Sequence, residues 1–515
     1  MNSGKLRKPV GKIPEFLSAA FVFYMSTFFV LFMNNGYFDI TGAKLAAFRY
    51  GALVFAVLTA ISLPVKFIFE GKAYASELSQ RLRPVRIPLI FLLCFAAGVI
   101  VSCSLSDYGN DAWTGPASRR LGGWFYLGCV FVCLLLVFCF RKGRLSAALE
   151  AAFAATVLIV TVLEVFQYCG NDLFGLYENI SENERTSFIS TLGNTNYAAS
   201  FFSLAIPLFA GLSLISEYVS IRLVSLAAFG ISIVGAYLTL ADSWLLSFSA
   251  CMAVMIIFVG RLDLKRVSFL IFAAAAAFAL LRVIVTSADD GFFAEEFAEK
   301  GLQQRLVSIG FIAILAAAGL LLFLIGTIEV LHGFRDILTH AFPLITILGI
   351  TVFAVLFILV NSGVNIDFMQ VFVVDDSWGS FRGFIWRISI GEFESLTAVR
   401  KLFGIGSDCF ANVLRENRLS EMVLTSNSVY VDAHSEFLQS LLCHGIFGFT
   451  AYIGFFVSSA AVFLLRFVKK NSAQSLVGIL CIAGFLGQGL VNNPQVLTTP
   501  LVFVLMGAVL AEAHL

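Results

Sequence analysis

The stretch IPLIFLLCFAAGVIVSCS, residues 87–104, contains no charged side chain and is apolar over most of its length. A helix needs roughly 20 mainly apolar residues to cross a bilayer core of about 30 Å. A transmembrane strand would be shorter and would alternate strictly between apolar and polar residues, which this stretch does not do. The segment therefore predicts one crossing of a lipid bilayer by an α-helix.

Similar stretches recur along the whole chain of 515 residues. Hydrophobic residues make up 59% of the chain and charged residues 13%, whereas soluble domains average roughly 45–50% and about 25%. About fourteen stretches have the length that a spanning helix needs, and they lie near residues 15–35, 45–65, 87–104, 124–140, 146–166, 196–213, 224–241, 244–260, 267–285, 305–326, 341–362, 443–465, 474–490 and 498–512. We predict an all-α fold, a polytopic transmembrane helical bundle of about 12–14 spans with the lipid bilayer as its solvent.

The distribution of basic residues predicts how the bundle is oriented. Lys5, Arg7, Lys8 and Lys12 precede the first apolar stretch. If this end lies in the cytoplasm, every second loop is cytoplasmic, and those loops are rich in lysine and arginine, as the positive-inside rule requires. They carry Lys66, Lys72, Arg81, Arg83, Arg86, Arg141, Lys142, Arg144, Arg222, Arg261, Lys265, Arg266, Arg335, Arg466, Lys469 and Lys470. We therefore expect a multi-pass protein of a bacterial inner membrane with both termini in the cytoplasm.

The net charge and the cysteine pattern bear on whether the chain binds nucleic acid or a metal. The formal net charge is +1, which gives no indication of a nucleic-acid partner. The ten cysteines are scattered, mostly within apolar stretches, and form neither a CxxC pair nor a Cys/His metal spacing. We expect no nucleic-acid partner, no metal and no cofactor.

The apolar stretches divide the chain into three regions. Residues 1–362 would hold about eleven transmembrane helices and residues 436–515 about three. Between them, residues 363–435 form a large extracytoplasmic loop, and a loop of this length without a function is uncommon. Its apolar residues at helical spacing are Phe381, Phe384, Ile385 and Ile388. They predict an amphipathic helix that lies along the membrane surface or caps the mouth of the bundle, either as part of a site or only as a shield.

The segment Asp432-Ala433-His434-Ser435-Glu436 precedes the apolar run at 443–465. We expect His434 in the first turn of the helix that begins there, at the outer water boundary. A helix N-terminus disfavours imidazolium and keeps the ring neutral. A neutral imidazole can accept a proton from a sugar hydroxyl, so His434 is a candidate general base. The alternative is a histidine that only caps the helix or forms a local hydrogen bond.

Several short patterns together resemble the O-antigen ligase and O-antigen polymerase superfamily. His434-Ser435, nine residues, then Gly445-x-x-Gly448 is similar to the signature of that family. The other matching pieces are Arg382-x-x-x-Trp386, the Gly404-Ile405-Gly406 turn, Gly193-Asn194-Thr195-Asn196, and the stretch from Gly115 to Gly122 with Arg119 and Arg120. Each piece is short, so their order, spacing and common placement over residues 90 to 465 carry the resemblance.

The resemblance implies an enzyme that transfers a glycan from a polyprenyl (undecaprenyl) diphosphate carrier to an acceptor hydroxyl. The acceptor is another glycan or a different cell-surface molecule, so polymerase and ligase both remain open. Transfer at the outer face would be inverting and independent of metal. Guanidinium binds phosphate oxygens bidentately, so the resemblance gives Arg382 the role of principal diphosphate clamp and His434 that of the base.

Further roles follow from the same resemblance. The candidate substrate-binding residues are Arg387, Arg185, Asn196, Trp386 and Ser435. For the two arginines, an ordinary residue of the membrane interface is the alternative. Gly445 and Gly448 would form a packing motif that lets a neighbouring helix approach closely.

One position departs from the family pattern. Trp244 stands where the family has a second diphosphate-binding arginine. Either another basic residue (Arg185, Arg305 or Arg387) substitutes, or the substrate has changed, or activity is lost. The alternative function is a lipid-linked oligosaccharide flippase, which about fourteen spans would also suit. The polar chemistry is concentrated in one loop and no internal repeat is visible, and both observations favour the enzyme.

Overall fold

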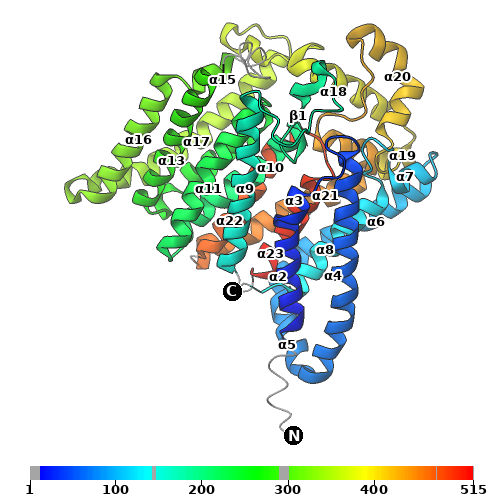
Figure 1. Ribbon diagram of the computed structural model, residues 1–515, viewed down its shortest axis with the longest axis horizontal. Helices are drawn as coiled ribbons and strands as arrows, with labels where there is room; N and C mark the ends of the chain where they lie inside the picture. The colour runs from blue at the N-terminus through cyan, green and yellow to red at the C-terminus, as the bar shows by residue number, and fades with distance from the viewer. Residues whose placement is uncertain (1–11, 142–145, 289–300, 471, 514–515) are drawn as a thin grey trace.

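The computed structural model describes residues 12–141, 146–288, 301–470 and 472–513. Most of these residues lie in helices, which form a bundle (Figure 1). The only strand pairing within these ranges is a short hairpin in which β1 (Phe188–Ile189) pairs antiparallel with β2 (Gly193–Asn194). The predicted all-α fold is therefore confirmed.

Ten helical segments in the described ranges are long and apolar enough to cross a membrane. They are α2 (Ile13–Ser26) with α3 (Phe28–Leu31), α4 (Ile40–Glu70), α5 (Lys72–Leu82) with η1 (Arg83–Val85) and α6 (Arg86–Leu105), α9 (Ser146–Tyr168), α10 (Thr195–Ile215), α11 (Val219–Leu238), α13 (Leu264–Ser287), α16 (Ile309–Thr327), η4 (Glu329–Leu331) with α17 (His332–Asn361), and α21 (Glu436–Lys470). Shorter apolar helices are α8 (Gly123–Cys139), α12 (Ser243–Ile257), α22 (Ala473–Gly489) and α23 (Thr498–Ala511). Each predicted apolar stretch overlaps one of these helices, which is consistent with a multi-pass membrane protein.

Helix α4 extends beyond the predicted stretch 45–65 at both ends and has 31 residues. Its N-terminus is capped by Asp39, whose carboxylate accepts a hydrogen bond from the amide of Gly42. Its C-terminus ends at Gly71, which has a positive φ of 53°, a conformation that glycine adopts without steric penalty. Capping residues rather than the limits of hydrophobicity therefore set the length of this helix.

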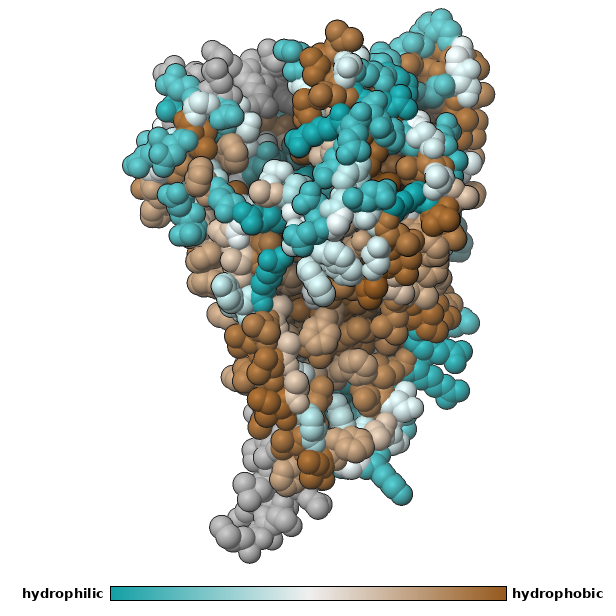
Figure 2. Space-filling view, turned by 90° about the vertical axis from the view of Figure 1, so that its right-hand side faces the viewer, coloured by the Kyte–Doolittle hydropathy of each residue, from teal (hydrophilic) through white to brown (hydrophobic). Residues whose placement is uncertain are grey.

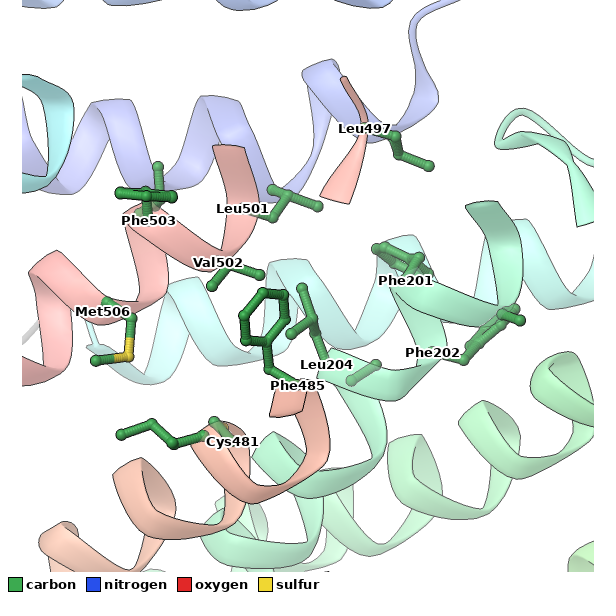
Figure 3. Close-up of a cluster of buried hydrophobic side chains, with 14 of the residues drawn as sticks. Phe201, Phe202, Leu204, Cys481, Phe485, Leu497, Leu501, Val502, Phe503 and Met506 are labelled. Carbon is green, nitrogen blue, oxygen red and sulfur yellow. The ribbon is translucent and has the colours of Figure 1, made fainter. Parts of the chain in front are cut away.

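Helix α10 is the centre of the bundle. In the most apolar stretch of α10, 89% of the residues are buried, which is the largest share among the long helices of the described chain. It packs against α11, α12 and α22, and Figure 3 shows the apolar cluster where its side chains meet those of α22 and the α23 region. The cluster includes Phe201, Phe202, Leu204, Cys481, Phe485, Leu501 and Phe503. Close packing of these side chains holds α10 away from the lipid-facing surface.

The surface of the molecule changes character along the bundle. On the face seen in Figure 2, hydrophilic residues gather at the upper end and an apolar surface lies below them. Helices α16 and α17 are the most exposed of the long helices, because only 11% and 6% of the residues in their most apolar stretches are buried. A large apolar surface of this kind indicates contact with lipid rather than with water.

The segment between α17 and α21 folds over one end of the bundle, opposite α5 (Figure 1). It contains η5 (Asp367–Phe372), α18 (Trp378–Ser395), α19 (Ala398–Phe403) and α20 (Phe410–Ser426). Three of the four residues whose spacing predicted an amphipathic helix, Phe384, Ile385 and Ile388, are buried on α18. The inclusion of Phe381 was wrong, because its backbone is not helical (φ 68°). The same end of the bundle therefore holds most of the polar sequence that lies between spans.

Helix α21 is kinked at Gly445, which has a φ of 66°. The kink leaves the carbonyl groups of Leu442 and Cys443 free to accept hydrogen bonds from the amides of Ile405 (3.2 Å) and Gly406 (3.1 Å). A Cβ atom at Gly404, which has a φ of 85°, would overlap the carbonyl oxygen of Cys443. The turn after α19 is thus joined to α21 by direct contact between two backbones.

Gly448 lies one turn after the kink and faces another glycine. A Cβ atom on Gly98 of α6 would lie 3.0 Å from the Cα atom of Gly448. Helices α6 and α21 share one of the most extensive contacts among the described elements. Small residues at such a position let the two helix axes approach each other.

We expect Gly404→Ala to lower the free energy of unfolding by about 1–3 kcal/mol, because the left-handed conformation becomes strained and the new methyl group overlaps the backbone of α21. Gly349→Ala is the matched control, since Gly349 lies within α17 with no atom within 4 Å of the added methyl group. Thermal unfolding of the purified protein in detergent measures both. Equal unfolding temperatures for the two variants would contradict the described contact.

Candidate functional site

A buried arginine joins distant segments at the polar end of the bundle. Arg119 lies in the turn between α7 (Asn110–Thr114) and α8. Its Nε atom donates to Asp408 Oδ1 (2.9 Å), and its Nη1 atom donates to Asp432. Its Nη2 atom donates to the backbone carbonyl of Pro494 (3.2 Å). The guanidinium group therefore bonds to three segments that are far apart in the sequence.

The charges in this cluster stabilise one another. Burial alone would lower the pKa of the Arg119 guanidinium, but the carboxylates of Asp432 and Asp408 outweigh burial and hold that pKa above its usual range. Burial would raise the pKa of Asp432, but the charge of Arg119 and the hydrogen bonds from the His434 amide and the Asn493 side chain outweigh burial and lower that pKa. Asp432 is therefore ionised at neutral pH, and each of the three Arg119 side-chain nitrogens already donates to an oxygen of the protein.

His434 does not lie in the first turn of a helix, so the predicted position was wrong: α21 begins at Glu436. The Oδ1 atom of Asp432 accepts a hydrogen bond from the His434 amide (2.9 Å) and lies 3.3 Å from His434 Nδ1. This local turn holds His434 at a φ of 45° and competes with helical geometry. Because Nδ1 faces Asp432, Nε2 is the ring nitrogen that remains for a ligand.

The His434 ring is neutral at physiological pH. Burial lowers its pKa, the carboxylate of Asp432 partly offsets this, and the charges of Arg382 and Arg119 lower it further. The sequence suggested a helix N-terminus as the cause of a neutral ring. Burial and two nearby arginines provide the cause instead, and the ring is well placed to accept a proton.

Arg382 approaches the same cluster from α18. Its Nε atom donates to the carbonyl of Val491 (3.1 Å) and its Nη1 atom to the carbonyl of Gly379 (2.7 Å). Burial lowers its pKa, opposed by the charges of Asp242 and Asp432. No carboxylate of the described chain lies within 4.0 Å of the group. Its positive charge is thus held in place by backbone groups without a paired anion.

Arg387 differs from Arg382 in its partners. Its Nε and Nη2 atoms each lie 2.8 Å from a carboxylate oxygen of Asp376, and Nη1 lies 3.0 Å from Glu421. Five residues along a helix correspond to a rotation of about 140°, so Arg382 and Arg387 project to different sides of α18. Arg387 therefore belongs to an ion-pair network on the outer side of α18.

Trp386 lines a hollow of about 570 Å³ together with Arg387 and Asp376. Its ring packs against Trp378 with a centroid distance of 5.4 Å. Its indole N–H finds no hydrogen-bond partner among the described residues. Two adjacent indole rings beside charged groups form a surface on which a sugar ring can stack.

The connection between α22 and α23 contacts Arg382, Arg119 and Asp432, and sequence reasoning missed it. Val491 accepts from Arg382, and Asn492 Nδ2 donates to the carbonyl of Asn196 (3.1 Å). The Asn493 side chain hydrogen-bonds to Asp432, and Pro494 accepts from Arg119. The run of polar residues between two apolar helices is the signal in the sequence that could have identified this segment.

Other predicted site residues lie around this connection or apart from it. Asn196 is in the first turn of α10, and Ser435 is buried between His434 and α21. Arg185 lies in η2 (Glu182–Ser187), where its Nη1 atom is 3.8 Å from Glu182. The structure thus brings His434, Ser435 and Arg382 to one cluster.

Trp244, where the resemblance led us to expect a second arginine, is fully buried at the start of α12 and packs against Phe248. It brings no charge to the cluster. Asp242 precedes α12 and accepts a hydrogen bond from Gln303 Nε2 (3.3 Å). This end of α12 therefore presents a carboxylate, which is near enough to Arg382 to raise the pKa of its guanidinium.

No known family model and no curated protein matches this chain. Among the described residues, no group of three or more His, Cys, Asp and Glu side chains is arranged to hold a metal ion.

We expect Arg119→Ala to destabilise the protein by about 3–5 kcal/mol, because two buried carboxylates lose their counter-charge. Arg120→Ala is the control, since the neighbouring Arg120 forms an exposed pair with Asp39 that is worth less than about 1 kcal/mol. Thermal unfolding in detergent distinguishes the two. A similar small effect of both substitutions would show that the buried cluster is not required for stability.

The pKa of His434 is accessible through diethylpyrocarbonate, which reacts with neutral imidazole. We expect the modification rate, followed by mass spectrometry of the His434 peptide, to have its midpoint below the ordinary value of 6.5. Arg382→Gln removes a positive charge and should raise the midpoint, whereas Arg387→Gln should leave it unchanged. A wild-type midpoint at or above 6.5, or equal midpoints in all three proteins, would refute the assigned environment.

Proposed function

We propose that the chain is a membrane glycan transferase of the O-antigen ligase or polymerase type. It would move a glycan from a polyprenyl diphosphate carrier to an acceptor hydroxyl, with inversion at the anomeric carbon and without a metal ion. The sequence patterns at His434-Ser435, Gly445-x-x-Gly448 and Arg382-x-x-x-Trp386 support the proposal. So does their position at the polar end of an apolar bundle.

The observation that carries the proposal is the pairing of an oriented neutral histidine with an unpaired arginine. Asp432 fixes the His434 ring, and Arg382 is near enough to lower the pKa of that ring. Arg119 and Arg387 each bind two carboxylates, whereas Arg382 bonds only to backbone carbonyls. Arg382 is therefore the arginine of this group that can accept a new anion.

The proposed reaction is a single displacement. The acceptor oxygen forms a bond to the anomeric carbon while the bond from that carbon to the diphosphate oxygen breaks. The acceptor proton moves to His434 Nε2, and the lipid diphosphate leaves with the electron pair of the broken bond. Arg382 stabilises the negative charge that develops on the leaving oxygen. Asp432 stabilises the imidazolium that forms.

The remaining candidate residues suit the glycan rather than the reacting atoms. The Trp386 and Trp378 rings provide a stacking surface next to Arg387. Asn196 lies beside a network of amide and hydroxyl groups that is suited to sugar hydroxyls. Arg185 is assigned to the same surroundings by resemblance alone.

The proposal includes an orientation in a bacterial cytoplasmic membrane. Residues 363–435 would be extracytoplasmic and both termini cytoplasmic. The basic residues that the sequence places in alternate loops support this, because positively charged loops stay on the cytoplasmic side. Helix α5, for example, lies at the end of the bundle opposite α18 (Figure 1); it contains Arg81 and is followed directly by Arg83 and Arg86.

We expect His434→Ala and Arg382→Ala to abolish transfer of labelled lipid-linked glycan in membranes with matched expression. Loss of a general base alone lowers rates by about 10²–10⁴. The measurement is the amount of larger glycan product, together with the leaflet in which the lipid-linked donor accumulates. Accumulation in the outer leaflet is expected.

His340→Ala and Arg415→Ala are matched controls, because both side chains are exposed and lie outside the cluster. They should keep the wild-type activity. Unchanged product in the His434 and Arg382 variants would eliminate the site assignment. Accumulation of the donor in the cytoplasmic leaflet would favour the flippase instead.

A further inference from the structure

A second hollow lies at the opposite end of the bundle from His434. It is formed by the C-terminal end of α4, by α5, and by the start of α6, at the lower end of the molecule in Figure 1. Its volume is about 570 Å³. The apolar side chains of Phe67, Leu78 and Leu82 line it together with two arginines, Arg83 and Arg86. Apolar walls and cationic groups thus share one cavity.

The three arginines of this region differ in their burial and in their hydrogen-bond partners. Arg81 is buried and donates to four backbone carbonyls, which belong to Val137, Phe138, Phe140 and Ala511. Arg83 and Arg86 are exposed, and in the described ranges neither bonds to a carboxylate or a carbonyl oxygen. Arg81 therefore has a structural role at the ends of α8 and α23, and the other two guanidinium groups are available.

The hollow lies at the level where a membrane surface is expected. Helix α4 has 31 residues and is about 46 Å long at 1.5 Å per residue, whereas the hydrocarbon core of a bilayer is about 30 Å thick. Near its end, Phe67 is 54% exposed and Ile68 is 77% exposed. These apolar side chains can contact acyl chains, while the arginines beyond them reach the headgroup layer.

We propose that this hollow binds an anionic phospholipid. The phosphate group lies between the guanidinium groups of Arg83 and Arg86, and an acyl chain lies against Phe67, Leu78 and Leu82. Guanidinium is weakly hydrated and binds phosphate oxygens through two parallel N–H donors. The site is independent of the proposed transfer reaction, because it lies at the other end of the bundle.

The test uses the full-length protein in detergent and follows thermal unfolding during titration with phosphatidylglycerol or with phosphatidylcholine of the same acyl chains. We expect phosphatidylglycerol to stabilise the wild type at lower concentration than phosphatidylcholine. A basic group near an anionic lipid surface contributes about fivefold to binding, so Arg83→Gln/Arg86→Gln should weaken the response to phosphatidylglycerol about twenty-five-fold. Each single variant should weaken it about fivefold.

Lys469→Gln/Lys470→Gln is the matched control, because it removes two exposed positive charges at the end of α21 that lies away from Glu436. It should respond to phosphatidylglycerol as the wild type does. Equal loss in both double variants would mean general electrostatic attraction and would overturn the site. So would an equal response of the wild type to the two lipids, a wild-type response in the arginine variants, or full stabilisation by inorganic phosphate alone.

Discussion

The ion pairs of the buried Arg119 are the interaction on which the polar end of the molecule depends. Arg119 binds Asp408, Asp432 and the carbonyl of Pro494, which are separated from it by 289, 313 and 375 residues. Removing one partner from such a pair leaves an uncompensated charge inside the protein, which is strongly destabilising. The segments are therefore held together as one unit. Contacts with distant parts of the chain fix Asp432, and Asp432 in turn orients His434 through the local turn.

A bundle of apolar helices places a further constraint on this end of the molecule. Backbone groups that leave a helix need partners, since neither lipid nor apolar side chains provide them. The connection from Val491 to Pro494 meets this need with four consecutive residues, each bonded to a different part of the cluster. Asparagine suits the task, because its amide both donates and accepts hydrogen bonds. Polar groups can thus be concentrated in an interior that is otherwise apolar.

The features that sequence could predict are local ones. An apolar run reveals a helix without knowledge of its neighbours, and the spacing of Phe384, Ile385 and Ile388 likewise revealed α18. The start of α21 was missed because the Asp432 side chain bonds to the His434 amide and delays the helix. Arg119 lies in a stretch that the sequence analysis singled out, but its pairing with Asp408 depends on a contact between residues 289 positions apart. The different roles of Arg382 and Arg387 also required knowledge of which carboxylates lie nearby.

The charge of Arg382 lowers the pKa of His434, whereas the charge of Asp432 raises it. This opposition gives the proposed reaction an order. In the free protein, burial and the charge of Arg382 keep the pKa of His434 low, so the ring is neutral and ready to accept a proton. A diphosphate bound at Arg382 would bring negative charge and cancel that part of the effect. The ring would then become a stronger base only when the donor is present, and proton transfer is most effective when the pKa of the base is near the working pH. Asp432 would stabilise the imidazolium as the proton arrives. Trp244 adds no second positive charge, so in this proposal the coupling between donor and base runs through Arg382.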